Sequence, residues 1–330
     1  ISFHVTGVQT CALPIYRDLR ISVTDRCNFR CRYCMPAEGL EWLPRDGLLS
    51  FEEISRVASL MVDRFGIRSI RLTGGEPTVR AKLPDLVRLL SPLPVDLALT
   101  TNGATLRLLA AELAEAGLGR INVSLDSLRR DRFEELTLRD GLARVLDGIE
   151  AALAAGLSPV KVNVVVMRGV NDDELVDFAR FGRELGVTVR FIEFMPLDAE
   201  EAWSEAAVVS QEEILATISA VYPLEPPARS NAPATRFRYM DGGGEIGVVA
   251  SVTQSFCDSC DRIRLTADGQ FRNCLFATKE FDLRGLLHSG ASDDEVADLV
   301  ERAVAAKWAG HGIGRVDFIR PARSMSQLGG

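Results

Sequence analysis

The sequence predicts an α/β fold built on a parallel sheet. Between residues 19 and 222, short runs rich in apolar and β-branched residues alternate six times with segments of helical periodicity. In addition, Gly66, Gly117, Gly156 and Gly186 each follow a helical segment, where a left-handed C-cap favours glycine. Six βα units can form an open sheet or a partial barrel, and the spacing alone does not separate these two architectures.

The elements follow in order along the chain. The predicted strands are residues 19–24, 69–73, 95–100, 120–125, 160–166 and 187–194. The predicted helices are residues 51–65, 83–90, 104–116, 142–155, 172–185 and 211–221. Beyond residue 222 the pattern predicts a proline-rich linker (223–233), strands at 236–240 and 246–252, a hairpin formed by 262–266 and 271–273, and a helix at 293–306.

These patterns divide the chain into three parts. Residues 17–222 contain the βα units, and residues 223–330 form a C-terminal region. Residues 1–16 show neither periodicity, and the stretch 5–15 reads VTGVQTCALPI, which is the translation of a common sequencing-adapter oligonucleotide. We therefore predict that residues 1–16 are non-native or disordered, and we exclude Cys11 from any functional site.

Composition limits the class of protein. Of the 330 residues, 47% are apolar, which is enough for a large core, and the formal net charge is −8. An acidic chain does not favour nucleic-acid or membrane-surface binding, so an anionic ligand would need locally grouped arginines and lysines. No apolar run approaches the ~18 residues of a membrane span. These features predict a cytoplasmic protein.

The other six cysteines form two groups of three, Cys27-x3-Cys31-x2-Cys34 and Cys257-x2-Cys260-x13-Cys274. Odd groups do not suggest disulfides, and structural zinc normally takes four protein ligands. A [4Fe–4S] cube is usually held by four thiolates, so three would leave one iron open to a small molecule. Two alternatives remain at this point: the first group could be a buried helical stripe, and the second could bind zinc.

Several segments resemble a known family. The CxxxCxxC motif with an aromatic residue before its last cysteine (27–34) is similar to the radical S-adenosylmethionine signature, and the GGEP segment at 74–77 resembles the turn that receives the methionine amino group. DLRISVTDRCNFRCRYCMP, IRLTGGEPTVR, SVTQSFCDSCDRIRLTADGQFRNCLFA and the terminal diglycine resemble the GTP 3′,8-cyclases of molybdenum-cofactor biosynthesis. The resemblance runs from residue 17 to 330. The family's usual N-terminal residues are absent, and Thr78-Val79 departs from the usual apolar pair.

The resemblance implies a partial (β/α)6 barrel with a first [4Fe–4S] cluster at its open top and a second in the C-terminal region. It implies the cluster ligands Cys27, Cys31, Cys34, Cys257, Cys260 and Cys274. It places Tyr33, Gly75, Ser124 and Met195 against S-adenosylmethionine. The implied GTP contacts are Arg20, Arg71, Thr100, Lys161, Arg262, Ile263 and Arg264, with Arg190 a further candidate. Gly329-Gly330 would reach into the site.

The residues themselves support part of this assignment. Arg262 and Arg264 alternate on a predicted strand and so face one side, where paired guanidiniums suit phosphate oxygens. Arg71 and Lys161 lie in apolar strands, where an unpaired charge is costly. Without the resemblance, the arginine pair fits a solvated strand face equally well, Met195 fits core packing, and the diglycine fits a frayed terminus.

The resemblance also implies the reaction. S-Adenosylmethionine would yield a deoxyadenosyl radical that takes hydrogen from C3′ of GTP, and C3′ would then bond to C8, giving 3′,8-cyclo-7,8-dihydro-GTP. Its expected partners are a low-potential electron donor, a second copy of the chain in a homodimer, and the downstream cyclic pyranopterin monophosphate synthase. The alternatives are a two-cluster radical enzyme that acts on peptides and a zinc-stabilised binding module without catalysis.

Overall fold

The computed structural model describes residues 16–197, 203–227, 233–308, 310–313 and 318–329. Three predicted features therefore lie partly or wholly outside the described residues. These are residues 1–15 of the predicted non-native or disordered segment 1–16, with Cys11, the middle of the 223–233 linker, and Gly330. Tyr16, the last residue of that predicted segment, is described and is buried in the core, so disorder is wrong for this residue.

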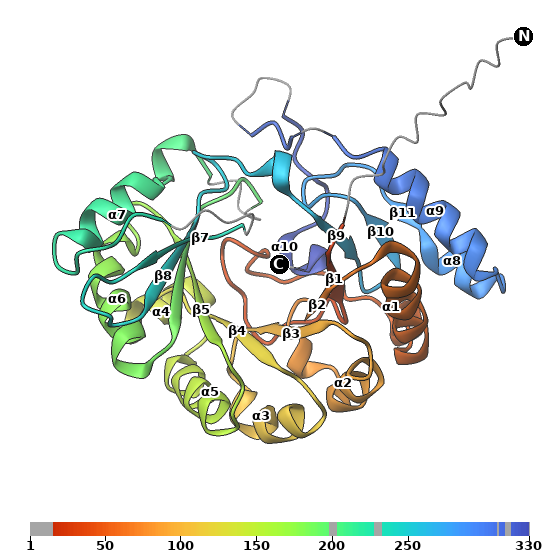
Figure 1. The fold of residues 1–330 in the computed structure, drawn as a ribbon, viewed down its shortest axis with the longest axis horizontal. Coiled ribbons are helices and arrows are strands. Elements are labelled where there is room, and N and C mark those ends of the chain that lie inside the picture. The colour runs from red at the N-terminus through yellow and green to blue at the C-terminus, as the bar shows by residue number, and fades with distance from the viewer. Residues whose placement is uncertain (1–15, 198–202, 228–232, 309, 314–317, 330) are drawn as a thin grey trace, which may run out of the picture.

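Eleven strands of the described chain form one sheet that curves into a partial barrel (Figure 1). The strands are β1 (Asp18–Ser22), β2 (Ser69–Thr73), β3 (Asp96–Thr101), β4 (Arg120–Ser124), β5 (Val160–Val166), β6 (Thr188–Glu193), β7 (Thr235–Arg238), β8 (Glu245–Val249), β9 (Arg262–Leu265), β10 (Gln270–Arg272) and β11 (Phe281–Asp282). Their order across the sheet is β11-β10-β9-β1-β2-β3-β4-β5-β6-β8-β7. The predicted α/β fold with a partial (β/α)6 barrel is confirmed.

Strands β1 to β6 pair in parallel, and the C-terminal region extends this sheet at both edges. β9 pairs in parallel with β1, and β8 pairs in parallel with β6. The hairpin partner β10 and the edge strand β7 are antiparallel. The two ends of the sheet therefore both come from the C-terminal third of the chain, which contributes to the same cavity as the βα units.

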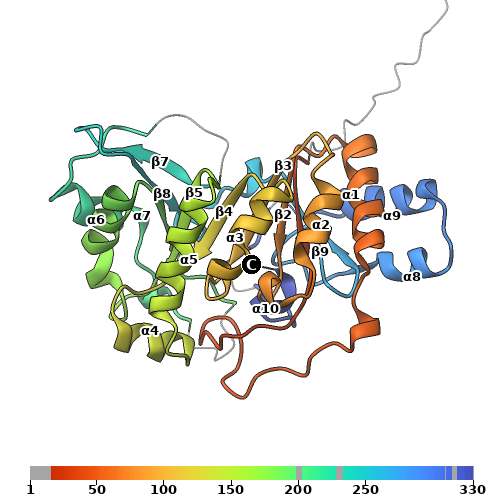
Figure 2. The same cartoon turned by 90° about the horizontal axis from the view of Figure 1, so that it is seen from below.

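Helices cover the outer face of the arc, and Figure 1 shows them surrounding the strands. They are α1 (Phe51–Phe65), α2 (Leu83–Leu90), α3 (Leu106–Glu115), α4 (Arg130–Thr137), α5 (Leu142–Ala154), α6 (Leu175–Leu185), α7 (Gln211–Ser219), α8 (Leu283–His288) and α9 (Asp293–Ala305). The short helix α10 (Met325–Leu328) lies instead near the centre of the barrel (Figure 1). Figure 2 shows α10 and the long loop after β1 at the same end of the barrel.

Local sequence explains where these elements begin and which side they bury. Ser50 and Glu53 form a capping box at the start of α1, and Gly66 ends it with φ +67°. Along β5, Val160, Val162, Val164 and Val166 are buried in the core between the sheet and the helices. The alternate residues face the inside of the barrel, because successive side chains on a strand point to opposite faces.

The structure differs from the predicted elements at particular points. The predicted strand 246–252 ends at residue 249, because the backbone amides of Val252 and Thr253 instead donate to the Glu193 carboxylate, both at 2.8 Å. Helices α4, α8 and α10 were not predicted, since they have eight residues or fewer and little apolar periodicity. The predicted hairpin and the C-terminal helix are confirmed.

Candidate active site

The inside of the barrel contains a cavity of about 760 Å³. Segments that follow β1, β2, β3, β4 and β6 all contribute to its wall, as expected for the carboxyl ends of parallel strands. Of the predicted site residues, these line it: Cys27, Cys31, Tyr33, Cys34, Arg20, Arg71, Gly75, Thr100, Ser124, Lys161, Arg190, Met195, Cys257, Cys260, Arg262, Arg264 and Cys274. Ile263 does not, because its side chain is fully buried on the opposite, core face of β9.

The first cysteine group lies in the loop after β1, outside any helix. The interpretation as a buried helical stripe is therefore wrong. Burial raises the pKa of Cys27 to about 11 and raises the pKa of Cys31 well above its usual range, and neighbouring thiolates add to the effect for Cys31. Burial and the Cys27 charge act on Cys34 in the same direction. Three buried thiols with raised pKa values therefore need a positively charged partner in order to ionise.

The GGEP turn packs directly on this loop. A Cβ at Gly74 would lie 2.4 Å from the backbone oxygen of Thr24, and one at Gly75 would lie 2.4 Å from that of Asp25. The Gly75 amide donates to Thr24 O at 2.8 Å. Glycine is therefore required at both positions, because any side chain would displace the loop that holds the cysteines.

Glu76 joins this turn to the end of β3. Its buried carboxylate accepts from Thr78 N (3.0 Å), Thr101 Oγ1 (2.6 Å) and the Asn102 amide (2.6 Å). Burial raises the pKa of Glu76, and these hydrogen bonds only partly oppose the effect. Asn102 in turn places its side-chain amide 3.8 Å from Cys27 Sγ. The polar Thr78, which departs from the family's usual apolar pair, thus supports Glu76.

A second buried network holds Tyr33, and sequence reasoning did not find it. The Tyr33 hydroxyl donates to Asp126 Oδ2 at 2.7 Å, and the Val165 amide donates to Oδ1 at 2.8 Å. Asn171 donates to the backbone oxygen of Asp126 at 2.8 Å. Burial raises the pKa of Asp126 to about 6. Tyr33 and Asp126 are 93 residues apart, so the only sequence signal that could have found Asp126 is its position two residues past the end of β4.

The second cysteine group lies on the C-terminal hairpin, on the other side of the cavity. Cys257 lies in a short 3-10 turn (Cys257–Ser259), and Cys260 and Cys274 flank β9 and β10. Burial pushes the pKa of Cys257 upward, but hydrogen bonds from His311 and Ser255 outweigh it and bring the pKa to about 7. His311 was not among the predicted site residues, because it lies at no metal-ligand spacing from the cysteines.

Nearby cations lower the pKa of Cys260, as hydrogen bonds lower that of Cys257. Burial favours the neutral thiol, but the charges of Arg262 and Lys307 outweigh it and lower the pKa. Lys307 Nζ also donates to the Cys260 backbone oxygen at 2.8 Å. Two members of this group are thus poised to ionise and bind a metal centre.

Positive side chains gather between the two cysteine groups. Arg264, Arg20 and Arg71 are aligned in register across β9, β1 and β2. Burial and the charge of Arg262 lower the pKa of Arg20 to about 9, and burial lowers the pKa of Arg71 to about 10, so both remain charged at neutral pH. The Nε atoms of Arg20, Arg71 and Arg262 are buried and have no hydrogen-bond partner among the described residues.

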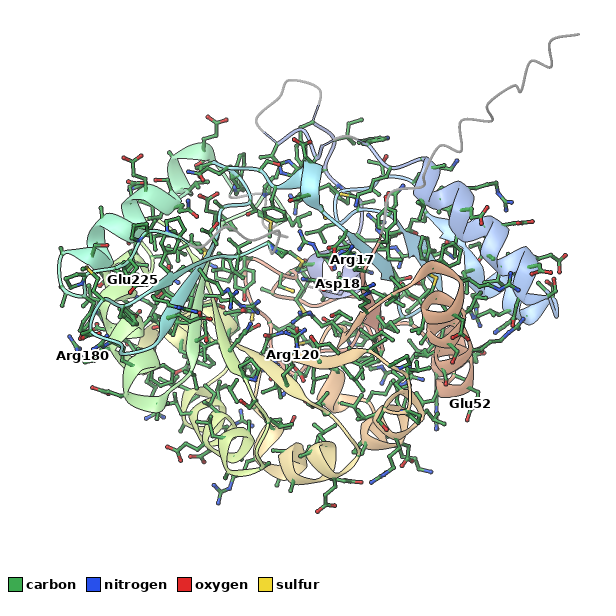
Figure 3. The ribbon with its side chains drawn as sticks, in the orientation of Figure 1. Arg17, Asp18, Glu52, Arg120, Arg180 and Glu225 are labelled. Atoms are coloured by element: carbon green, nitrogen blue, oxygen red, sulfur yellow. The ribbon has the colours of Figure 1, made fainter. Side chains whose placement is uncertain are left out.

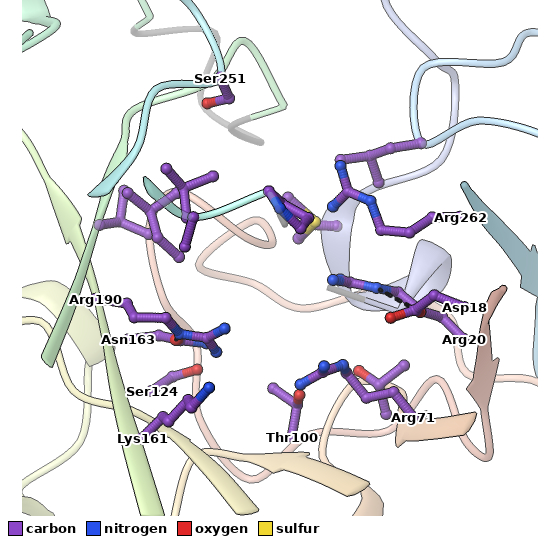
Figure 4. A pocket seen from close by; sticks show the side chains of 18 of the residues that line it. Asp18, Arg20, Arg71, Thr100, Ser124, Lys161, Asn163, Arg190, Ser251 and Arg262 are labelled. Carbon is purple, nitrogen blue, oxygen red and sulfur yellow. Dashed lines mark hydrogen bonds and ion pairs between the residues drawn. The ribbon is translucent and has the colours of Figure 1, made fainter. Parts of the chain in front are cut away.

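Lys161 and Arg190 face these arginines from β5 and β6, as Figure 4 shows. Arg190 donates to Asn163 Oδ1 and Asn122 Oδ1, both at 2.9 Å. Burial, Arg190 and Arg120 together lower the pKa of Lys161 to about 8. Figure 3 shows Arg120 and Asp18 near the centre, whereas Glu52 and Arg180 lie on the outside. The cavity is therefore a buried concentration of cations that suits a polyanion.

The C-terminal segment enters the cavity from one side, and Figure 1 places the C terminus near the centre of the barrel. Leu328 is buried, and the Gly329 backbone oxygen accepts from Arg264. A frayed terminus, the interpretation favoured without the resemblance, is wrong for these residues.

The donor sets fit iron–sulfur clusters better than a single metal ion. Among the residues that the structure describes, no three His, Cys, Asp or Glu side chains are gathered closely enough to hold one ion. Each cysteine group offers three thiols to one shared cavity, as a cube with one open iron requires.

No helix in the described parts of the chain has the length and apolarity needed to cross a membrane.

Comparisons with known proteins agree with this geometry. Residues 21–182 match the family model of the Radical SAM superfamily, and residues 187–313 match Molybdenum Cofactor Synthesis C. Among solved structures, Streptococcus suis SuiB bound to S-adenosylmethionine has a TM-score of 0.58 at 13% identity, over 86% of this chain and 68% of that one. Methylornithine synthase (PylB) has a TM-score of 0.50 at 16% identity, over 63% of each chain. These two structures share the fold.

The curated relatives are much closer in sequence. The chain is 48% identical to the GTP 3′,8-cyclase of Rhodopirellula baltica over 319 residues, which cover 94% of this chain and 89% of that protein. It is 49% identical to the GTP 3′,8-cyclase of Mycobacterium marinum over 323 residues, which cover 95% and 89%. With both cysteine groups and the cation set placed around one cavity, this level of identity shows that the chain belongs to the GTP 3′,8-cyclase family of radical S-adenosylmethionine enzymes.

Proposed function

We propose that this chain converts GTP to 3′,8-cyclo-7,8-dihydro-GTP, the first step of molybdenum-cofactor biosynthesis. The observation that carries the proposal is the set of buried cations between two groups of three cysteines in one cavity of about 760 Å³. A nucleoside triphosphate carries enough negative charge to neutralise these cations, whereas a neutral peptide does not.

Cys27, Cys31 and Cys34 hold a [4Fe–4S] cluster in this proposal, and Tyr33, Gly75, Ser124 and Met195 contact S-adenosylmethionine. When bound, the cluster supplies the electron that cleaves S-adenosylmethionine. The chain's own contribution is positional. The glycine turn presses against the cysteine loop, and the Asp126 carboxylate fixes the Tyr33 hydroxyl. The enclosing barrel excludes water from the reaction.

The cations hold the substrate. Arg20, Arg71, Lys161, Arg262 and Arg264, with Arg190 as a further candidate, supply planar forks and an ammonium for the phosphate oxygens. Thr100 offers a hydroxyl at the cavity wall. Ile263 can take part only through its backbone, because its side chain belongs to the core.

The second cluster, on Cys257, Cys260 and Cys274, is the finer part of the proposal. A cluster held by these three cysteines would offer an open coordination site to the guanine. His311 and Ser255 hydrogen-bond Cys257, and such bonds to sulfur ligands are typical of iron–sulfur sites. The homodimer, the low-potential electron donor, the downstream cyclic pyranopterin monophosphate synthase and the cytoplasmic location remain predictions. Light scattering on the reconstituted protein tests the first of these.

The proposal is tested by anaerobic reconstitution with iron and sulfide, followed by turnover with reductant and S-adenosylmethionine. GTP should give deoxyadenosine and the cyclic product together, whereas ATP should give neither above background. Deoxyadenosine formation with a peptide but not with GTP would favour the peptide-modifying alternative and contradict the proposal.

A matched pair of variants tests the phosphate assignment. Arg262→Ala with Arg264→Ala should weaken GTP binding by at least about 100-fold, since a hydrogen bond to a charged group contributes about 1.5–3 kcal/mol. The control is Arg180→Ala with Arg302→Ala, which removes the same charge from the outer surface. Unchanged GTP affinity in the cavity variant would contradict the assignment.

A further inference from the structure

The C-terminal segment 323–329 is fixed at its start by an ion-pair network. Arg323 donates to both carboxylate oxygens of Asp268, at 3.1 and 2.8 Å, and to Glu280 Oε2 at 2.8 Å, while its Nε lies 2.7 Å from Glu280 Oε1. Arg272, which is almost fully buried, pairs with the same Glu280. Asp268 lies in the β9–β10 turn, so this network attaches the segment to the hairpin that carries Arg262 and Arg264.

The other end of the segment reaches the first cysteine loop. Ser326 on α10 is 1% exposed, and its backbone amide and hydroxyl hydrogen-bond the Cys34 thiol. Met325 lines the cavity beside it. The Gly329 backbone oxygen accepts from Arg264, and a Cβ on Gly329 would lie 2.8 Å from Thr73 Cγ2. The segment therefore touches the substrate side and the first-cluster side of the cavity at once.

We propose that residues 323–329 form a bridge through which the hairpin controls the first cluster: Arg323 anchors the bridge and Ser326 tunes the cluster through Cys34. This inference rests on the part of the proposed function that places a cluster on Cys27, Cys31 and Cys34. Both residues are positioning residues, since neither holds iron or touches the reacting atoms.

The physical basis is the effect of hydrogen bonds on sulfur ligands. Donors to a cysteine sulfur stabilise the more negative, reduced cluster and so raise its reduction potential. Ser326 can donate to Cys34 only while α10 keeps its position, and α10 begins two residues after Arg323, which is held by Asp268. Loosening the anchor should therefore change a property of the cluster at the opposite end of the bridge.

The first experiment replaces Ser326→Ala in the reconstituted full-length protein. The first cluster is identified by the electron paramagnetic resonance signal that changes when S-adenosylmethionine is added. We expect unchanged iron content and a shift of this cluster to more negative potential in a redox titration. The control Ser289→Ala, on the exposed end of α8, should leave the potential as it is. An unchanged potential in Ser326→Ala would overturn the assignment of Ser326.

The second experiment replaces Arg323→Gln, with exposed Arg302→Gln as its control. We expect faster backbone hydrogen exchange in 324–329 and a potential shift in the same direction as in Ser326→Ala. Arg323→Lys, which keeps the charge, should have a smaller effect on both the hydrogen exchange and the potential than Arg323→Gln. Faster exchange with an unchanged potential would overturn the bridge. If Arg323→Gln does not fold, the Ser326→Ala titration still decides whether the tail tunes the cluster.

These readouts separate the bridge from the proposed reaction. The reduction potential and the hydrogen-exchange rates are measured on the reconstituted protein, and neither measurement requires that the enzyme form product. A potential shift in a protein that makes no cyclic nucleotide would sustain the bridge and contradict the proposed function. Full cyclase activity with no potential shift in either variant would support the proposed function and contradict the bridge.

Discussion

Replacing Lys161→Met should stabilise the protein and weaken its binding of GTP. In the substrate-free protein, the Lys161 amine is partly buried and faces Arg190 and Arg120, and these features lower its pKa from 10.5 to about 8. A pKa lowered to this extent corresponds to about 3 kcal/mol against the charged amine at neutral pH. Solvent screening at this partly exposed position reduces the effect to about 1–2 kcal/mol, or about 2 °C in Tm for a chain of this length.

The sign of the pH dependence follows from the same values. Because the folded-state pKa of about 8 lies below the unfolded value of 10.5, the native state binds fewer protons than the unfolded state between these values. The free energy of unfolding of the unsubstituted protein therefore rises with pH across this window. The advantage of Lys161→Met should be full below pH 8 and should fade as the pH approaches 10.5.

Thermal melts of the reconstituted protein at pH 7 and pH 9.5, with and without GTP, measure both effects. At a GTP concentration of 100 times the dissociation constant, binding should add about 2.7 kcal/mol to the free energy of unfolding. A 10- to 100-fold loss of affinity in the variant should reduce this gain to about 0.4–1.4 kcal/mol. The exposed Lys279→Met is the control. A lower Tm in Lys161→Met together with an undiminished gain from GTP would refute the reasoning.

Three further predictions concern the first-cluster side. Cys31→Ala should abolish deoxyadenosine formation and lower the iron content from about eight to about four per chain, so retained activity would remove this residue from the ligand set. Gly75→Ala should disrupt S-adenosylmethionine binding, because its Cβ would lie 2.4 Å from a backbone oxygen of the cysteine loop; equilibrium binding, with Gly119→Ala as the control, checks this. Tyr33→Phe and Asp126→Ala should each raise the KM for S-adenosylmethionine, and the double variant should be no worse than Asp126→Ala alone, since both substitutions remove the same 2.7 Å bond. Additive effects would show that the two residues act separately.

Sequence periodicity was sufficient for most of the elements of the barrel. The six βα units were predicted because apolar runs and glycine caps repeat along the chain. Closure into a partial barrel was not accessible from spacing, because it depends on the register between strands. The parallel pairing of Leu19 with Ile263 joins residues 244 positions apart.

Within the site, residues with a strong chemical signature were found and their supports were not. The cysteines are recognisable because they are grouped at short spacings in two sets of three, and the in-strand arginines because an unpaired charge is costly in a core. Asp126 and Ser326 have ordinary surroundings in sequence, and their roles arise from contacts across loops far apart in the chain. A four-residue helix such as α10 is too short to have a detectable period.

The pairing of β1 with β9 has a consequence for how the chain is made. On the ribosome, the first strand emerges about 240 residues before the strand that covers its outer edge. At the usual rate of synthesis this interval is about 10–50 s, during which β1 presents an unpaired edge. The nascent chain therefore has a period of vulnerability to aggregation, and delivery of iron and sulfide to the second cysteine group cannot be completed before that period ends.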